Sequence, residues 1–244
     1  DLIESGAESV AEILRHSYTS MDERVDRYFL LMCCFAPHGV NDELIIHAYD
    51  KPVEGGWALD QLASISFIHR EPSNTLSLHP LVAQFGQELQ KHKDFNYQAK
   101  FAEVMLNFLR ANESNLASDE VRKEKPHIND AIKVAQDNSL WETCAALCEY
   151  NASVEVGIQE QIDSLKKAYE IIEQNYPQQK RRLLNIRLQL GKIRRIAGQL
   201  VDALSDFKKA DALSSEIGNV DLAETASLSF ELGATLLALG RYSD

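Results

Sequence analysis

His79 stands at the start of a predicted helix, where a polar side chain can do chemistry. Pro80 follows it, and proline is tolerated at the first helical position because that residue needs no backbone hydrogen bond. Leu81, Phe85 and Leu89 then recur at helical spacing. Unpaired N–H groups at a helix start favour an anion such as phosphate. Two interpretations of His79 follow: a neutral imidazole that donates an N–H to a phosphate oxygen, or a ring satisfied by a backbone carbonyl.

A second group of side chains with binding chemistry is basic. Seven Lys or Arg and no acid occur between residues 180 and 195: Lys180, Arg181, Arg182, Arg187, Lys192, Arg194 and Arg195. Lys180, Arg187 and Arg194 lie seven residues apart, so they share one face of a helix. The first interpretation is a solvated face. The alternative is a partner-binding surface for an acidic peptide, or for the acidic front part of the chain.

The chain shows no constellation for catalysis. A phosphate-binding loop of the form Gly-x-x-x-x-Gly-Lys-Ser/Thr is absent, since Gly191-Lys192 is followed by Ile193 and lacks the upstream glycine. No nucleophile has a base at catalytic spacing, so we predict a non-enzymatic chain with no catalytic residues and no cofactor of its own. The cysteines, Cys33, Cys34, Cys144 and Cys148, lack zinc-finger spacing, so we expect no metal site but structural thiols in a reducing cytoplasm.

Charge and hydropathy limit the partners. The formal net charge is −12, and nucleic-acid binding depends on neutralising phosphates with Lys and Arg, so we do not expect it. The longest apolar runs, such as residues 28–36, are too short to span a bilayer, so we expect no membrane association. A protein or peptide ligand is the expected partner.

The elements that position His79 occupy residues 1–92. Four apolar helical patterns come first, around residues 10–14, 25–35, 42–48 and 57–65, with Asn41 or Asp42 as the cap of the third. Two short alternating runs, residues 66–69 and 76–79, flank the turn Glu71 to Asn74 and predict a β-hairpin. Helices followed by a small hairpin indicate a winged-helix domain.

The remainder of the chain is helical by periodicity. Residues 93–150 are expected to form a helical connector, and residues 151–244 an α-α superhelix of repeats. Leu190-Gly191 with Gly198 recurs as Leu232-Gly233 with Gly240, an offset of 42 residues. Asp244 aligns with Asp202, so we expect the last repeat to be truncated and the array to continue. The predicted fold class is therefore mainly α.

Two family resemblances are carried by particular residues. Leu190-Gly191, Gly198, Ala203, Phe207 and Ala210 resemble the tetratricopeptide repeat, in the longer variant seen in kinesin-light-chain-type arrays. Residues 13–18, 29–35, 43–45 and 76–82 resemble the winged helix of signalling NTPases of the apoptotic-ATPase and plant-resistance-protein kind, the STAND type with an NB-ARC core. Residues 127–142 are similar to the connector that often joins such winged helices to repeats.

The resemblance implies a function. In that family the histidine of a Met-His-Asp motif contacts the β-phosphate of ADP, and Leu78-His79-Pro80 would stand in for it, without the acidic third residue. ADP or ATP would bind to a nucleotide-binding core upstream of this chain, and the winged helix would couple nucleotide state to the repeats. Two alternatives stay open: a stand-alone repeat scaffold that binds proteins, and a winged-helix transcription regulator.

Overall fold

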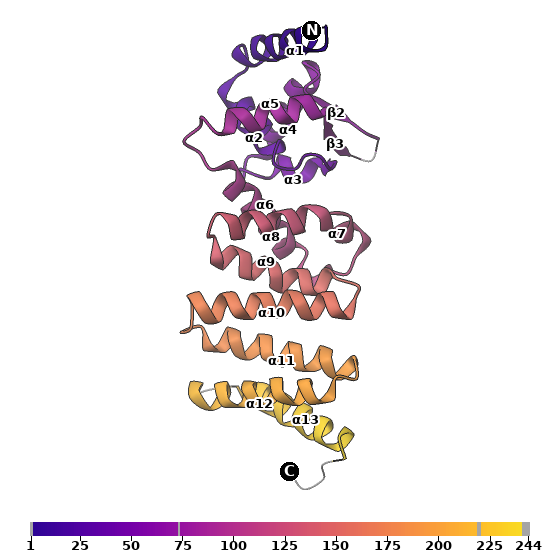
Figure 1. The fold of residues 1–244 in the computed structure, drawn as a ribbon, viewed down its shortest axis with the longest axis vertical. Coiled ribbons are helices and arrows are strands. Elements are labelled where there is room, and N and C mark those ends of the chain that lie inside the picture. The colour runs from indigo at the N-terminus through magenta and orange to yellow at the C-terminus, as the bar shows by residue number, and fades with distance from the viewer. Residues whose placement is uncertain (1, 73, 219–220, 241–244) are drawn as a thin grey trace. The chain divides into compact units, whose positions relative to one another are not determined.

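The computed structural model describes residues 2–72, 74–218 and 221–240 (Figure 1). The fold is mainly α with one small sheet, as predicted. The chain divides into two compact units, one of residues 1–108 with 129–134 and the other of residues 109–128 with 135–244.

The first unit is built from short helices and a sheet. Its elements in chain order are α1 (Leu2–Thr19), α2 (Glu23–Met32), β1 (Val40–Asn41), α3 (Asp42–Ile46), α4 (Pro52–Ser64), β2 (Ile68–Arg70), β3 (Thr75–Leu78) and α5 (Pro80–Gln90). α6 (Tyr97–Ala111) and α8 (Lys125–Asp137) contribute residues to both units.

The predicted hairpin is confirmed, and it gains a third strand. β2 and β3 pair antiparallel with His69 opposite Ser77, while β1 pairs with the other edge of β3, giving the order β1-β3-β2. We expected the hairpin alone. A strand of two residues, Val40–Asn41, is too short to show the alternation by which strands are recognised in a sequence. Ser73 of the expected turn lies outside the described residues.

The core of the first unit forms around α2. Tyr28, Phe29, Leu30, Leu31 and Met32 are fully buried, which a helix achieves only when its neighbours surround it. The helix ends at Met32 rather than at residue 35, because residues 33–36 form turns before a proline. The cap predicted at Asn41 is confirmed, since its side chain accepts the backbone N–H of Glu43 at 3.0 Å.

The second unit contains η1 (Glu113–Asn115), α7 (Asp119–Lys123) and a helical array. We use "the array" for α9 (Trp141–Val154), α10 (Ile158–Asn175), α11 (Lys180–Ile196), α12 (Leu200–Ile217) and α13 (Leu222–Ala238) (Figure 1). Contacts join α9 to α10, α10 to α11, α11 to α12 and α12 to α13, so successive helices pack in pairs.

The 42-residue period appears in the helix boundaries. α13 begins and ends 42 residues after α11, at 222 against 180 and 238 against 196. α12 relates to α10 in the same way, at 200 against 158 and 217 against 175. The boundary expected at residues 150/151 falls inside α9, whose last residue, Val154, lies 42 before Ile196. The end of α9 thus follows the same period, and the domain bounds stay a prediction. Asp244 lies outside the described residues.

Glycines serve two purposes in the repeat. Gly198 and Gly240 end α11 and α13 with φ of 75° and 71°, a conformation that side-chain-bearing residues rarely adopt. Gly191 instead permits close packing, because a Cβ there would lie 2.4 Å from the Phe207 ring. At Gly191 the absence of a side chain therefore lets α11 and α12 approach closely.

Candidate functional site

His79 caps the helix that it precedes. Its backbone is extended, with φ −63° and ψ 139°, and its Nδ1 accepts the Leu81 N–H at 3.2 Å. The N–H groups of Val82 and Ala83 both donate to the His79 carbonyl, at 2.9 and 3.0 Å, and Pro80 has no N–H. The first N–H groups of α5 are thus satisfied within the chain. The sequence-based picture of an open cradle of N–H groups is wrong, and so is that of a ring satisfied by a carbonyl.

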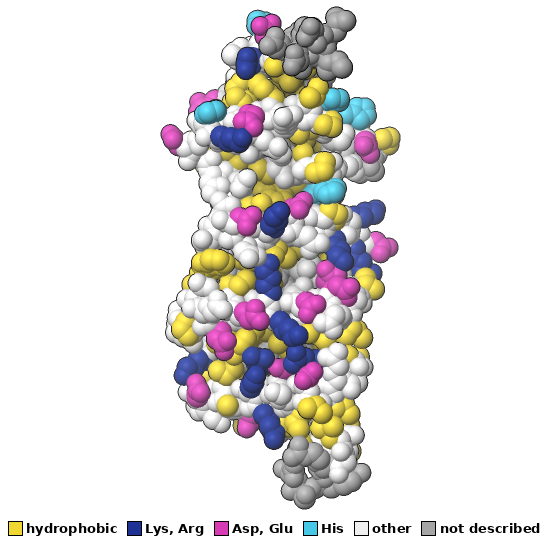
Figure 2. Space-filling view, viewed as in Figure 1, with side chains coloured by type: hydrophobic (Ala, Val, Ile, Leu, Met, Phe, Trp, Pro, Cys, Tyr) yellow, Lys and Arg dark blue, Asp and Glu magenta, His cyan; other side chains and the backbone are white. Residues whose placement is uncertain are grey.

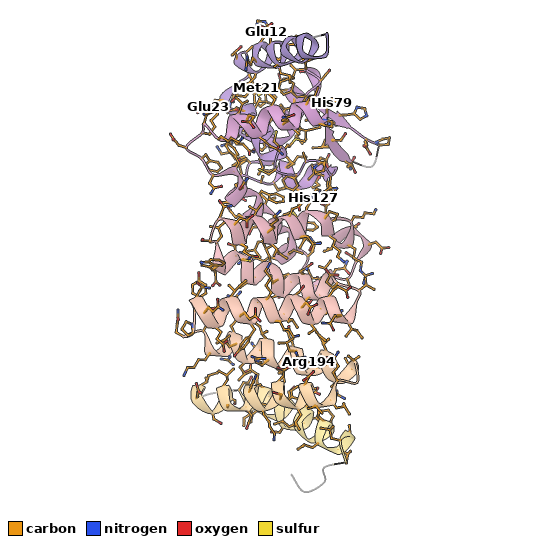
Figure 3. All side chains as sticks on the ribbon, in the orientation of Figure 1. Glu12, Met21, Glu23, His79, His127 and Arg194 are labelled. Atoms are coloured by element: carbon orange, nitrogen blue, oxygen red, sulfur yellow. The ribbon has the colours of Figure 1, made fainter. Side chains whose placement is uncertain are left out.

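The capping bond fixes the chemistry of the imidazole. A nitrogen that accepts a hydrogen bond carries no proton, so in the neutral ring the proton resides on Nε2. The side chain is exposed, at the junction of β3 and α5 (Figure 3). His79 therefore presents one N–H donor, Nε2–H, toward the surroundings. Contact with a nucleotide phosphate stays a prediction.

α5 is held rigidly on α2, which holds His79 in place. Gln87 Nε2 donates to the Cys33 carbonyl at 3.1 Å, and Gln90 Nε2 donates to the Leu30 carbonyl at 2.6 Å. These amides occupy carbonyls at the end of α2 that have no partner within their own helix. At Gly86 a Cβ would lie 2.2 Å from the Cys33 Sγ, so the two helices are in close contact.

The basic side chains of α11 all find partners within the second unit. Six form ion pairs: Lys180 with Glu216, Arg181 with Glu224, Arg182 with Glu142 and Glu149, Arg187 and Arg194 with Asp206, and Arg195 with Glu231. The seventh, Lys192, donates to the Ser227 hydroxyl at 3.4 Å. Acidic and basic side chains accordingly alternate on the visible face of the array (Figure 2).

Asp206 binds two of the three residues of the predicted stripe. Its carboxylate accepts from Arg187 at 2.8 Å and from Arg194 at 2.5 Å. The side chain of Asp206 is 1% exposed, and those of Arg187 and Arg194 are 15% and 13% exposed. The Arg187 guanidinium also lies 3.7 Å from the centre of the Tyr169 ring. We call these residues the Arg–Asp bridge.

The prediction that the stripe is a solvated face is wrong for Arg187 and Arg194, because both side chains are largely buried. Of the three stripe residues, Lys180 has an exposed side chain, at 44%. Partner binding by Lys180, Arg187 and Arg194 stays a prediction, in which an acidic peptide would have to displace Asp206. The sequence analysis missed Asp206. One indication was available, because Asp206 falls in the apolar pattern of Ala203, Phe207 and Ala210, where an acid needs a partner.

A groove of about 480 Å³ is lined in part by Arg182 and its partners Glu142 and Glu149. Its walls come from the segment around η1, from α9 and from α11, and include Arg110, Glu113, Tyr150, Ser153 and Gln189. Arg182 crosses it to Glu142 at 2.5 Å and Glu149 at 2.6 Å. Burial raises the pKa of the Glu149 carboxyl, an effect that Arg182 opposes. The groove can accommodate polar groups of a peptide.

Three of the four cysteines are shielded from solvent. Cys33, Cys144 and Cys148 are buried, as expected, and Cys34 is partly buried. Burial raises the pKa of the Cys34 thiol to about 12, which leaves almost no thiolate at neutral pH. Among the described residues no group of three or more His, Cys, Asp or Glu could hold a metal ion. None of the helices that the structure describes is long and apolar enough to cross a membrane.

The helix that would read DNA in a winged helix is α4. It carries Asp60, whose carboxylate pairs with Arg70 of β2 at 2.9 Å. Arg27 and Lys51 pair with Glu54 at its first turn. In the middle of α4, Gln61 has a side chain of a type that can read a base edge.

Comparison with known proteins gave one weak likeness to report. No family model matches the chain, and no curated protein matches it. Among solved structures it is similar to a Signal Transduction ATPase with Numerous Domains (STAND) protein with a tetratricopeptide repeat sensor from Pyrococcus horikoshii, at 13% identity and a TM-score of 0.42. The match covers 91% of this chain and 48% of that protein, so this chain spans about half its length. Similarity at this level carries no functional argument, and the residues themselves must supply it.

Proposed function

We propose that this chain is the non-catalytic regulatory and protein-interaction part of a STAND-type signalling ATPase. In this proposal the first unit is a winged helix that couples nucleotide state to the array, and the array binds a protein or peptide signal. From α2 onward, the order of elements in the first unit supports this assignment: a helix, a strand, two helices and a hairpin whose last strand pairs with the first one. ADP or ATP would bind upstream, at a core that this chain does not supply.

The observation that carries the proposal is the directed imidazole of His79. Nδ1 is engaged by Leu81, Nε2–H is free to donate outward, and α5 is anchored on α2 by Gln87 and Gln90. A donor of fixed direction at an exposed position suits recognition of one phosphate oxygen. The histidine would contribute a single hydrogen bond, worth about 1.5 to 3 kcal/mol to a charged acceptor.

The test separates the capping role of His79 from its contact with the nucleotide. In the full-length protein, His79→Ser keeps a side-chain oxygen that caps α5 but removes the Nε2 donor. We expect its affinity for ADP to fall at least tenfold, with an unchanged thermal midpoint. His69→Ser, on the neighbouring strand, is the matched control and should bind ADP normally. Normal ADP binding by His79→Ser would exclude the phosphate contact.

A second candidate function is a protein-binding scaffold without a nucleotide link. The groove of about 480 Å³ bordered by α9 and α11 favours it, because paired helices with polar side chains along a groove can hold an extended peptide. The two candidates differ in one observable, which is whether peptide affinity changes with nucleotide in the full-length protein.

A further inference from the structure

In the groove bordered by the η1 segment, α9 and α11, two carboxylates share one guanidinium. Arg182 Nη1 lies 2.5 Å from Glu142 Oε1, and Arg182 Nη2 lies 2.6 Å from Glu149 Oε1. One positive charge therefore serves two negative charges, and these three residues keep a net charge of −1. We call them the shared-arginine group.

Glu142 is the more accessible carboxylate of this group. Its side chain is 54% exposed, against 28% for Glu149. Arg182 bonds to Oε1 of Glu142, and Gln179 Nε2 donates to its Oε2 at 3.3 Å. Two carboxylate oxygens offer about four acceptor positions, so Glu142 has room for a further donor. Because the group is one positive charge short, a charged donor is favoured over a neutral one.

The other polar side chains of the groove do not supply that charge. Arg110 and Glu113 have opposite charges and cancel, so the lining as a whole stays at −1. Tyr150, Ser153 and Gln189 are neutral, and each has a side chain that both donates and accepts hydrogen bonds. These groups suit the N–H and C=O groups of an extended main chain. The groove thus combines sites for a peptide backbone with a place for one cation.

The described parts of this chain do not provide the cation. Residues 1–90 contain 14 acidic and 5 basic residues, and the basic side chains of α11 all have partners within the second unit. Each new helix of the array packs on the helices just before it, and neither α12 nor α13 lines this groove. A net charge of −12 also attracts basic proteins over a longer range.

We propose that this groove binds an extended segment of a basic partner protein and places one of its arginine side chains against Glu142. An arginine suits the position because its planar guanidinium pairs with carboxylates and remains charged at any physiological pH. The proposal rests on peptide binding by the array, which both candidate functions above include, and it adds the charge of the ligand.

Two matched peptides test the charge. The probe is an acetylated and amidated heptapeptide of Gly and Ser with one central arginine, and its control carries citrulline there, which has the same shape without the charge. NMR titration of the isotope-labelled 244-residue chain measures binding. We expect saturable shifts of groove amides, including those of Tyr150 and Ser153, with the arginine peptide. The citrulline peptide should bind about fivefold more weakly, the upper range for an exposed ion pair.

Two matched protein variants separate the groove from the overall charge. Glu142→Gln keeps the shape of the side chain and an oxygen for Arg182 but removes the charge, so the arginine peptide should bind about fivefold more weakly. Glu170→Gln removes the same charge from an exposed position of α10, which does not line the groove, and should bind the peptide normally. Circular dichroism checks that both variants keep their helices.

Four outcomes would overturn the proposal. Equal binding of the two peptides would exclude recognition of a cation but leave peptide binding by the array in place. No binding of either peptide would exclude both. Equal weakening by the two variants would assign the attraction to the overall charge. Binding of the arginine peptide by the 244-residue chain but not by the full-length protein would assign the groove to a segment of the same polypeptide. The ADP experiment on His79 is independent of all four.

Discussion

Individual residues in this protein act through hydrogen bonds that the sequence only partly reveals. His79 is at once a helix cap and an outward donor, because its two ring nitrogens have different partners. Asp206 accepts a hydrogen bond from a different guanidinium group at each of its two carboxylate oxygens. In both cases one side chain serves two purposes.

The Arg–Asp bridge should be a major stabilising feature of the array. Asp206→Asn leaves Arg187 and Arg194 without a counter-charge at a site where both are largely buried, and it should lower the free energy of unfolding by about 3 kcal/mol. Urea unfolding measures the loss. Asp202→Asn, an exposed position of the same helix, should change stability by less than about 0.5 kcal/mol. Equal free energies of unfolding for the two variants would show that the Arg–Asp bridge does not stabilise the array.

Elements of the array repeat in their boundaries more closely than in their residues. α11 and α13 share length, the glycine at the twelfth position and the C-terminal glycine in the left-handed conformation. Their other positions diverge, so that Ser229 and Leu236 of α13 stand where α11 has Arg187 and Arg194. The repeat is thus kept in the helix boundaries, while the side chains on the surface of each helix differ with what they contact.

The two equivalent glycines should respond oppositely to alanine. Gly191→Ala places a methyl group against the Phe207 ring, which has to move, so we expect a loss of about 1 to 3 kcal/mol. Gly233→Ala meets nothing within 4 Å and removes a poor helix former, so we expect a gain of about 1 kcal/mol. Thermal unfolding of the two single variants decides, and a destabilised Gly233→Ala would contradict this assignment.

At the scale of the whole molecule, both the net charge of −12 and the pairing of basic side chains within the chain disfavour binding to nucleic acid. Every basic side chain of α11 has a partner in the second unit, and α4 presents Asp60 where a DNA-reading helix needs donors. Neither α11 nor α4 therefore offers unpaired positive charge that could release counterions from a nucleic acid.

We therefore expect no binding of duplex DNA by this chain, even at about 50 mM salt, where phosphate contacts are strongest. Electrophoretic mobility shift with a random-sequence duplex measures it, with a basic DNA-binding protein as the positive control. A salt-sensitive shift would revive the transcription-regulator alternative.

Local patterns were enough to predict much of this protein. The helix cap at Asn41, the helix start at His79-Pro80, the hairpin and the 42-residue period all depend on residues close in sequence, whose turn preferences and periodicity act over one or two turns. They established a mainly α fold with a helical array. They also placed His79 at a helix start, and this is the position that it occupies.

Only the tertiary structure decided what the side chains at those positions meet. β1 exists because Val40 and Asn41 lie beside β3, and Arg187 and Arg194 are buried because α12 brings Asp206 between them. Likewise the N–H groups at the start of α5 are closed by the ring and carbonyl of His79. Such pairings depend on directions and distances between groups far apart in the chain or on ring orientation, which no local spacing rule contains.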